Sequence, residues 1–305
     1  MVGFNGIDMR RKLGRQKSLR RQAGFSLLEM TIVCAILTIV LAAIFGVVNT
    51  SMQRSQAEQV RVNLVQEGRE FIDEFERDLH QAGYPNCRMV STLGNNCPAD
   101  NATTEGNSIY VAAGIVYLDN TKIIFEGDVD GDGQVDSVQY VLIDSAGNNP
   151  PTGTCPCSIR RSQVQKSASF DSQNQAVVWT QELQNIVNSG QPTGTSAYGG
   201  GVSISGNTAW GATNTAYYAA VSSFKDYPVF QAYDQNGGII QINPGLNTNT
   251  TANSLILNCQ PSNNNCVKTI RITLNLLGDA TTGVDQQTKV RPVTTLVGDA
   301  RLVNN

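Results

Sequence analysis

Residues 20–48 read RRQAGFSLLEMTIVCAILTIVLAAIFGVV, and this stretch decides how the rest of the chain is interpreted. Phe25 to Val48 is a 24-residue run in which Glu29 is the only charged residue. An apolar run of that length can cross a bilayer as a helix. A charge inside a bilayer costs at least ~2.5 kcal/mol, so we expect Glu29 to serve a function.

Basic residues precede the apolar run. Residues 1–24 contain seven Lys and Arg but only one acid, Asp8. The positive-inside rule then predicts a cytoplasmic N-terminus, one membrane pass and an exported C-terminus. The rest of the chain has 15 basic and 24 acidic residues, a net charge near −9, so we expect no general nucleic-acid binding.

The composition is typical of an exported, turn-rich β protein, because only 15% of the 305 residues are charged. Cys34 lies in the apolar run, where we expect it to be passive. The other six cysteines lie in the part predicted to be exported, and an even number there predicts disulfides: Cys87, Cys97, Cys155, Cys157, Cys259 and Cys266.

Gly24, a small residue of the kind expected at a cleavage site, stands before the apolar run. An ordinary secretory signal has a shorter apolar core followed by its cleavage site. Cleavage after Gly24 would instead remove the basic leader and leave the apolar helix on the mature protein. The simpler alternative is an uncleaved signal anchor in which Glu29 has no role.

Gly24-Phe25-Ser26-Leu27-Leu28-Glu29 resembles the processing motif of type IV prepilins and pseudopilins. The resemblance implies that a membrane peptidase cuts after Gly24 and that Phe25 is N-methylated. It implies that Glu29 pairs with the N-terminal amine of an adjoining subunit. A buried charge is costly alone and attracts an opposite charge strongly, which agrees with that role.

The same resemblance implies the partners and the location. The partners are other pilin subunits, major and minor, the prepilin peptidase/N-methyltransferase and the inner-membrane assembly platform. The implied location is the inner membrane, with the C-terminus in the periplasm, and then the pilus at the cell surface.

The helix is predicted to continue to about Gln81, since Gly83 and Pro85 end the pattern. Apolar residues recur near helical spacing beyond the apolar run: Val60, Leu64, Phe71, Phe75 and Leu79. We therefore predict four parts: a cytoplasmic leader (1–24), a transmembrane half of the helix (25–48), an amphipathic half (49–82) and an exported, disulfide-containing β-rich domain (83–305).

The C-terminal part shows short β-like patterns, as in SVQYVLI and TIRITLNL. The fold class is α+β and type IV pilin-like, with a long helix packed on a mainly antiparallel sheet. Residues 177–188 are predicted as a short helix or a strand pair. The expected strands are Ser108–Ala112, Ile115–Leu118, Lys122–Phe125, Ser137–Ile143, Val229–Tyr233, Ile239–Ile242, Ser254–Leu257 and Thr269–Leu276.

Finer features resemble the PilW-like minor pilins: RDLHQAGYPN at the helix end, IIFEGDVDGDGQVDSVQYVL, VFQAYDQNG, and the C-terminal IRITLNLLGD with VTTLVGDARLVNN. The resemblance covers most of the chain, but only the first sixty residues are specific. Residues 189–222, rich in Gly, Ser, Thr, Asn and Ala, and the six cysteines depart from the group's pattern.

DVDGDGQVD, residues 128–136, is spaced like a calcium-binding loop with glycine at its sixth position. The twelfth position, normally Glu, is Gln139, and Glu126 is a candidate substitute. The alternative is an acidic hairpin turn without an ion. The candidate ligands of a structural Ca²⁺ are Asp128, Asp130, Asp132, the Gln134 carbonyl and Asp136.

Two cysteine pairs are close in sequence, Cys87 with Cys97 and Cys259 with Cys266, and would close short loops. Cys155 and Cys157 are separated by one residue and have no assigned partner. We expect no enzymatic activity, because the chain's single histidine, His80, stands two positions from Asp78 and such neighbours do not face each other on a helix.

The predicted function is that of a minor type IV pilin that primes or enters a filament and supports assembly, twitching motility, adhesion or DNA uptake. A type II secretion pseudopilin is a close alternative. A membrane-anchored, calcium-stabilised adhesin or binding domain is an alternative of a different class.

Overall fold

The computed structural model describes residues 24, 26–86, 89, 110–144, 146–151, 154–166, 178–188, 203–204, 227–242, 245–247, 251–259, 265–278 and 293–303. The chain divides into two compact units, residues 1–51 and 52–305. The predicted insertion at 189–222 lies outside the described residues except for 203–204.

The helix α1 (Leu27–His80) confirms the predicted long N-terminal helix. Its second half buries a stripe spaced three and four residues apart, which is the spacing of one helix face. The turn after His80 ends it, and Gly83 there has a φ of 77°, a conformation that favours glycine. The buried residues of this half are Leu64, Gly68, Phe71, Ile72, Phe75, Asp78 and Leu79.

The second unit contains a ten-stranded sheet in the order β10-β1-β2-β3-β5-β6-β11-β8-β9, with β12 also paired to β11. Its strand pairs are antiparallel, so the predicted fold class is confirmed. The bounds are β1 Ile115–Leu118, β2 Lys122–Gly127, β3 Asp136–Ile143, β5 Cys157–Gln165, β6 Thr180–Ile186, β8 Phe230–Tyr233, β9 Ile239–Ile240, β10 Leu246–Asn247, β11 Thr269–Leu277 and β12 Val293–Arg301.

Two shorter elements complete the described chain. The strands β4 (Thr154–Cys155) and β7 (Ser203–Ile204) form a separate parallel pair. The helix α4 (Thr251–Leu257) is followed by Asn258, whose side chain bonds both the backbone N–H and the carbonyl of Ile115. These bonds tie α4 to β1.

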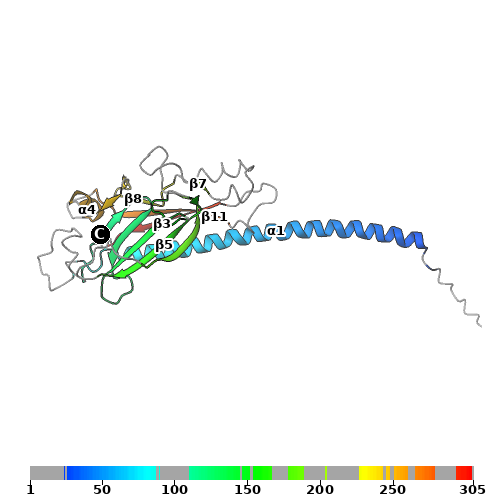
Figure 1. Ribbon diagram of the computed structural model, residues 1–305, viewed down its shortest axis with the longest axis horizontal. Helices are drawn as coiled ribbons and strands as arrows, with labels where there is room; N and C mark the ends of the chain where they lie inside the picture. Colours follow the sequence, from blue (N-terminus) through cyan, green and yellow to red (C-terminus); the bar gives the residue numbers. More distant parts are fainter. Residues whose placement is uncertain are drawn as a thin grey trace, which may run out of the picture. The chain divides into compact units, whose positions relative to one another are not determined.

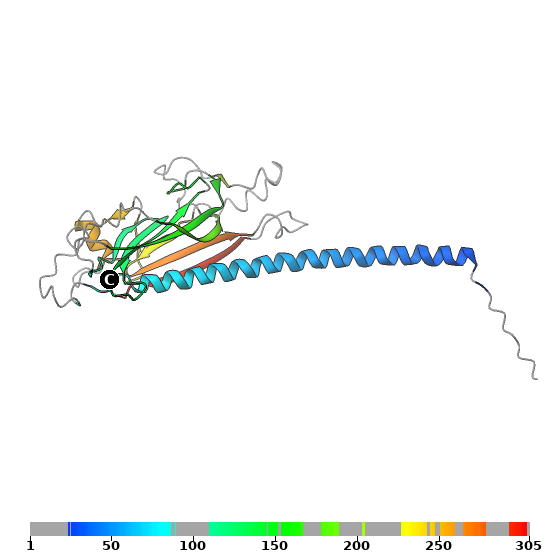
Figure 2. The same cartoon turned by 60° about the horizontal axis from the view of Figure 1, so that its bottom comes forward.

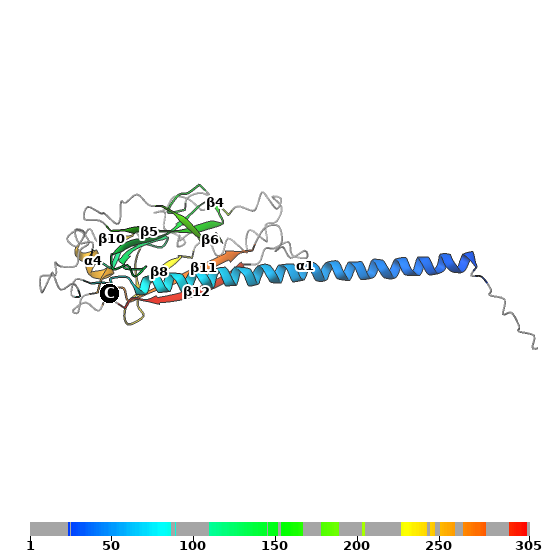
Figure 3. The same ribbon diagram turned by 90° about the horizontal axis from the view of Figure 1, so that it is seen from below.

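The second half of α1 lies along β11 and β12 (Figures 2 and 3). The absence of side chains at two glycines allows this close packing. A Cβ at Gly68 would meet Leu296 and Leu276, and one at Gly298 would meet Ile72. A larger residue at either place would force the neighbouring side chains to shift.

An aromatic cluster fills the core between α1 and the sheet (strands labelled in Figure 1). Phe75 is fully buried, and its ring centroid lies 5.3 Å from that of Tyr140 and 5.5 Å from that of Phe230. Aromatic pairs at such distances stabilise a core beyond the area they bury. This cluster fixes the half of α1 that carries the side chains discussed below.

Two strand predictions are wrong. Residues 110–112 of the predicted strand Ser108–Ala112 are not a strand, since the Ala112 N–H bonds the Pro85 carbonyl and the next N–H bonds the Glu126 carboxylate. Ser254–Leu257 is the end of α4. A short run such as Leu-Ile-Leu does not distinguish a strand from a buried helical turn. Residues 180–186, predicted as a helix or strand pair, form the single strand β6.

Candidate functional site

The predicted processing site lies just before α1. Gly24 is exposed, Phe25 lies outside the described residues, and the Ser26 carbonyl accepts the first helical hydrogen bond, from the Met30 N–H. Glu29 falls in the first helical turn and is exposed. Gly24 therefore precedes the helix and Glu29 lies at its start, while cleavage after Gly24 and the pairing of Glu29 stay predictions.

The first half of α1 is suited to an apolar surrounding. Among the described residues α1 is the one helix that is long and apolar enough to cross a membrane. The hydroxyls of Thr31 and Thr38 in this half, and of Thr50 just after it, each donate to a carbonyl three or four residues earlier. Because their polar groups are satisfied inside the helix, these residues add little cost in a bilayer. Cys34 is a free, exposed cysteine of this half.

The other half of α1 is held to the sheet by a buried polar cluster. One oxygen of Asp78, Oδ2, accepts bonds from the Tyr140 hydroxyl at 2.7 Å and from Arg161 Nη2 at 2.7 Å and Nε at 2.9 Å. Asp78 is 2% exposed. Burial and then the charge of Asp78 raise the pKa of Tyr140, so the phenol stays a donor. Sequence periodicity does not reveal this cluster.

The acidic loop between β2 and β3 gathers three of the predicted ligands. One carboxylate oxygen each of Asp128, Asp130 and Asp132 lies within 4.8 Å of the others. The turn is closed by Gly131 and Gly133, both at positive φ, whose N–H groups donate to the Asp128 carboxylate. Three hard oxygen donors this close suit Ca²⁺ chemically.

Two other acids near the loop are placed differently. Asp136 does not belong to the group of three, and its Oδ2 accepts a bond of 2.8 Å from Gln163. Burial, followed by the charge of Asp130, raises the pKa of Asp136 to about 6. The Glu126 carboxylate accepts from Lys166 Nζ at 2.7 Å in a buried ion pair. Glu126 is therefore not the substitute ligand considered from sequence.

The described cysteines give part of the disulfide map. Cys259 is joined to Cys266, as the sequence suggested, with a Cα–Cα distance of 5.2 Å. Cys157 is disulfide-bonded as well. Cys87, Cys97 and the side chain of Cys155 lie outside the described residues, so the predicted pairing of Cys87 with Cys97 stays a prediction.

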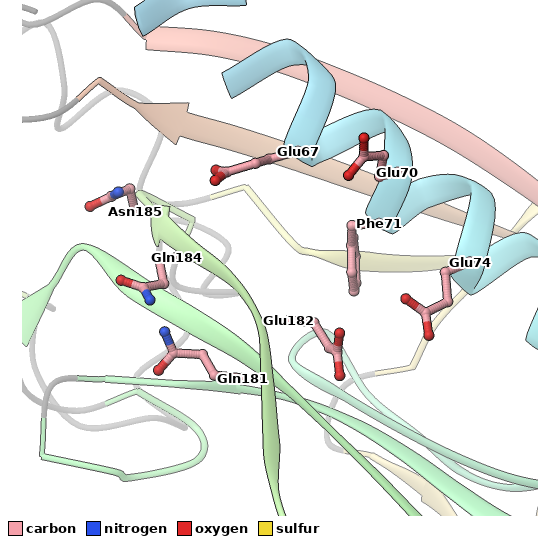
Figure 4. A pocket seen from close by; sticks show the side chains of 8 residues that line it. All are labelled: Glu67, Glu70, Phe71, Glu74, Gln181, Glu182, Gln184 and Asn185. Carbon is pink, nitrogen blue, oxygen red and sulfur yellow. The ribbon is translucent and has the colours of Figure 1, made fainter. Parts of the chain in front are cut away.

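A groove of about 350 Å³ lies between α1 and β6 (Figure 4). Phe71 points from the helix into it, and β6 contributes Glu182 and the amides of Gln181, Gln184 and Asn185. On α1, Glu67, Glu70 and Glu74 line it at spacings of three and four residues. The spacing of these glutamates can be seen in the sequence, but the sequence does not show that β6 faces them.

Charge in the groove is only partly compensated. Glu74 Oε1 lies 3.8 Å from Arg161 Nε. The pKa of Glu74 is nevertheless raised, first by burial and then by the charge of Glu182. Among the described residues Glu67, Glu70 and Glu182 take part in no ion pair.

Residues 19–45 match the prokaryotic N-terminal methylation motif. No curated protein and no solved structure matches the chain. The match covers the junction at Gly24, Glu29 and most of the apolar half of α1. The chain thus carries a prepilin-type methylation motif that includes the start of an apolar helix, and both features fit a type IV pilin or pseudopilin that is processed as a prepilin.

Proposed function

We propose that this protein is a minor pilin of the PilW-like group, cleaved between Gly24 and Phe25, methylated at Phe25 and incorporated into a type IV pilus. The single observation that supports this most is the match of residues 19–45 to the methylation motif, directly at the start of a membrane-length helix. The role is structural: priming or extending the filament.

Assembly in this proposal uses Glu29 and the apolar half of α1. After cleavage, Phe25 becomes the N-terminus and Glu29 lies one helical turn away. A carboxylate in an apolar helix bundle is costly unless an opposite charge meets it. The N-terminal amine of an adjoining subunit supplies that charge, so docking of a new subunit at the filament base removes the cost.

The test is the mass of the N-terminal peptide of this protein recovered from sheared surface filaments. An N-methylated peptide that begins at Phe25 supports the proposal. Protein that is found only in membranes, with the basic leader attached, refutes it and favours a membrane-anchored binding domain. A processed peptide in a protein absent from pili but needed for secretion favours a type II secretion pseudopilin.

We further propose that the loop between β2 and β3 binds Ca²⁺ as a structural ion. The Asp128, Asp130 and Asp132 carboxylates would hold it, and the ion would offset the repulsion between them. Bound Ca²⁺ would stiffen the connection of two central strands. No catalytic role follows from this arrangement.

A further inference from the structure

Among the described strands, β6 has a backbone edge that its neighbours leave largely unpaired. On one side β6 pairs with β5, but on the other it pairs with β11 only through Ile186 and Leu276. Among the described residues, no backbone hydrogen bond joins 180–185 to β11. An unpaired edge is a template on which another extended chain can add a strand.

This part of β6 also forms one wall of the groove against α1. Side chains above the strand edge are acids and amides, and three of the four glutamates have no ion pair within the described residues. Carboxylates and amides with free hydrogen-bonding capacity suit a partner that brings cationic donors.

The spacing of the glutamates argues against a metal ion. Within the described residues, Asp128, Asp130 and Asp132 form the one group of three or more acids whose carboxylate oxygens lie within 4.8 Å of one another, and the glutamates of the groove form no such group. The negative charges of the groove are instead spread along it, from Glu67 through Glu70 to Glu74 on the helix. An elongated partner with more than one positive charge fits that distribution.

We propose that this groove binds a short basic segment of a second polypeptide in an extended conformation. Its backbone pairs with the edge of β6, and its Lys or Arg side chains bond Glu67, Glu70 and Glu182. Phe71, which is 4% exposed, closes the floor of the groove beneath them. The inference stands on the groove alone and does not rest on the proposed pilin function.

The test uses the full-length protein in a zwitterionic detergent and the fluorescein-labelled peptide Val-Arg-Val-Arg-Val, followed by fluorescence anisotropy. Glu67→Gln/Glu70→Gln/Glu182→Gln is expected to raise the Kd at least about tenfold, since each lost charge-assisted bond weakens binding. The matched control, Glu58→Gln/Asp73→Asn/Glu76→Gln, removes the same charge from α1 outside the groove and should change the Kd less than about twofold.

Two further probes separate strand pairing from simple charge attraction. The same peptide with N-methylated backbone amides keeps its charges but cannot pair with β6, and it should bind at least about tenfold more weakly. Four outcomes would each overturn the proposal. Two concern the variants and the modified peptide: equal effects of the two triple variants, or unchanged binding of the N-methylated peptide. The other two are displacement of the peptide by spermidine at the concentration at which unlabelled peptide displaces it, or no binding below about 1 mM.

Discussion

Asp78 shows how a single charged residue can fasten a helix to a sheet. It stands between the buried Phe75 and Leu79, at a position where the periodicity of α1 predicts an apolar side chain. Its place is explained by Tyr140 and Arg161, which both donate to it from the sheet. The partners come from residues more than sixty positions later, so the sequence gives no sign of the cluster.

Replacing Asp78 by Ala should lower the free energy of unfolding by about 3 kcal/mol, because Arg161, 14% exposed, would lose the nearer of its two carboxylate partners and Tyr140 would lose its acceptor. Thermal unfolding of the full-length protein in detergent, followed by circular dichroism, measures the change. Tyr140→Phe removes only a hydroxyl donor and should cost about 1 kcal/mol. Equal stability of the two variants would show that the ion pair does not hold α1.

At the scale of elements, strong periodicity predicted structure well and mixed patterns did not. The helix α1 was predicted within two residues at each end of its observed span, and β3 and β11 within one, because each buries a regular face. The sequence does not predict β5, because the adjacent Arg160 and Arg161 interrupt its alternation of apolar and polar residues. The pairing of β5 with β6 is irregular at the same place. The strand β6 is too polar to be identified alone.

The acidic loop yields a prediction about metal binding. Saturating Ca²⁺ at about 100 times its Kd should stabilise the protein by about 2.7 kcal/mol. Asp128→Asn/Asp130→Asn/Asp132→Asn should abolish that gain, as measured by the thermal midpoint with Ca²⁺ and with EGTA. Asp234→Asn is the matched control, an acidic turn residue outside the group of three, and should leave the gain intact. A gain that survives in the triple variant would exclude the loop as the site.

An ion pair between β11 and β12 yields a prediction about the dependence of stability on pH. Arg271 donates to both carboxylate oxygens of Asp299, at 2.7 and 2.8 Å, and these bonds lower the pKa of Asp299. A lowered pKa means that the stabilisation is present above the unfolded pKa, near 3.9, and is lost as the pH falls through the folded value.

Because both side chains are largely exposed, the pair should contribute only about 0.2–1 kcal/mol. We expect Arg271→Gln to lower the thermal midpoint at pH 7, and we expect this difference from the wild type to shrink as the pH falls through the folded pKa of Asp299. Thermal scans of both proteins across this range measure the difference. If the difference in thermal midpoint stays constant with pH, it does not come from the ion pair. It then comes from packing of the Arg271 side chain on Tyr233, above whose ring the guanidinium lies.

For the whole molecule, Glu29 carries the prediction about assembly. Glu29→Gln should still be cleaved after Gly24, but its amount in sheared filaments should fall at least about tenfold, since the neutral amide forms no ion pair. Immunoblots of filament and membrane fractions measure this. Thr31→Val, which loses a hydroxyl bonded within its own helix, should enter filaments normally. Normal incorporation of Glu29→Gln into filaments would show that the charge of Glu29 is not needed for assembly.

The candidate sites differ in how far the sequence reveals them. The junction at Gly24, Glu29 and the spacing of Asp128, Asp130 and Asp132 are local patterns, and a contiguous stretch contains all that is needed to predict them. The groove requires Glu67 and Glu70 to face Glu182, more than a hundred residues later, and only the packing of α1 and β6 brings them together. Local patterns predict local sites, and sites built across elements require the fold.

The last strand, β12, pairs with β11 along all nine of its residues. Its Gly298 and Leu296 also contact α1, so the core joins two parts of the sequence that lie far apart. On the ribosome α1 emerges long before β12. A nascent chain therefore cannot complete this core until β12 has left the ribosome, and until then the apolar face of α1 has no native strand to cover it.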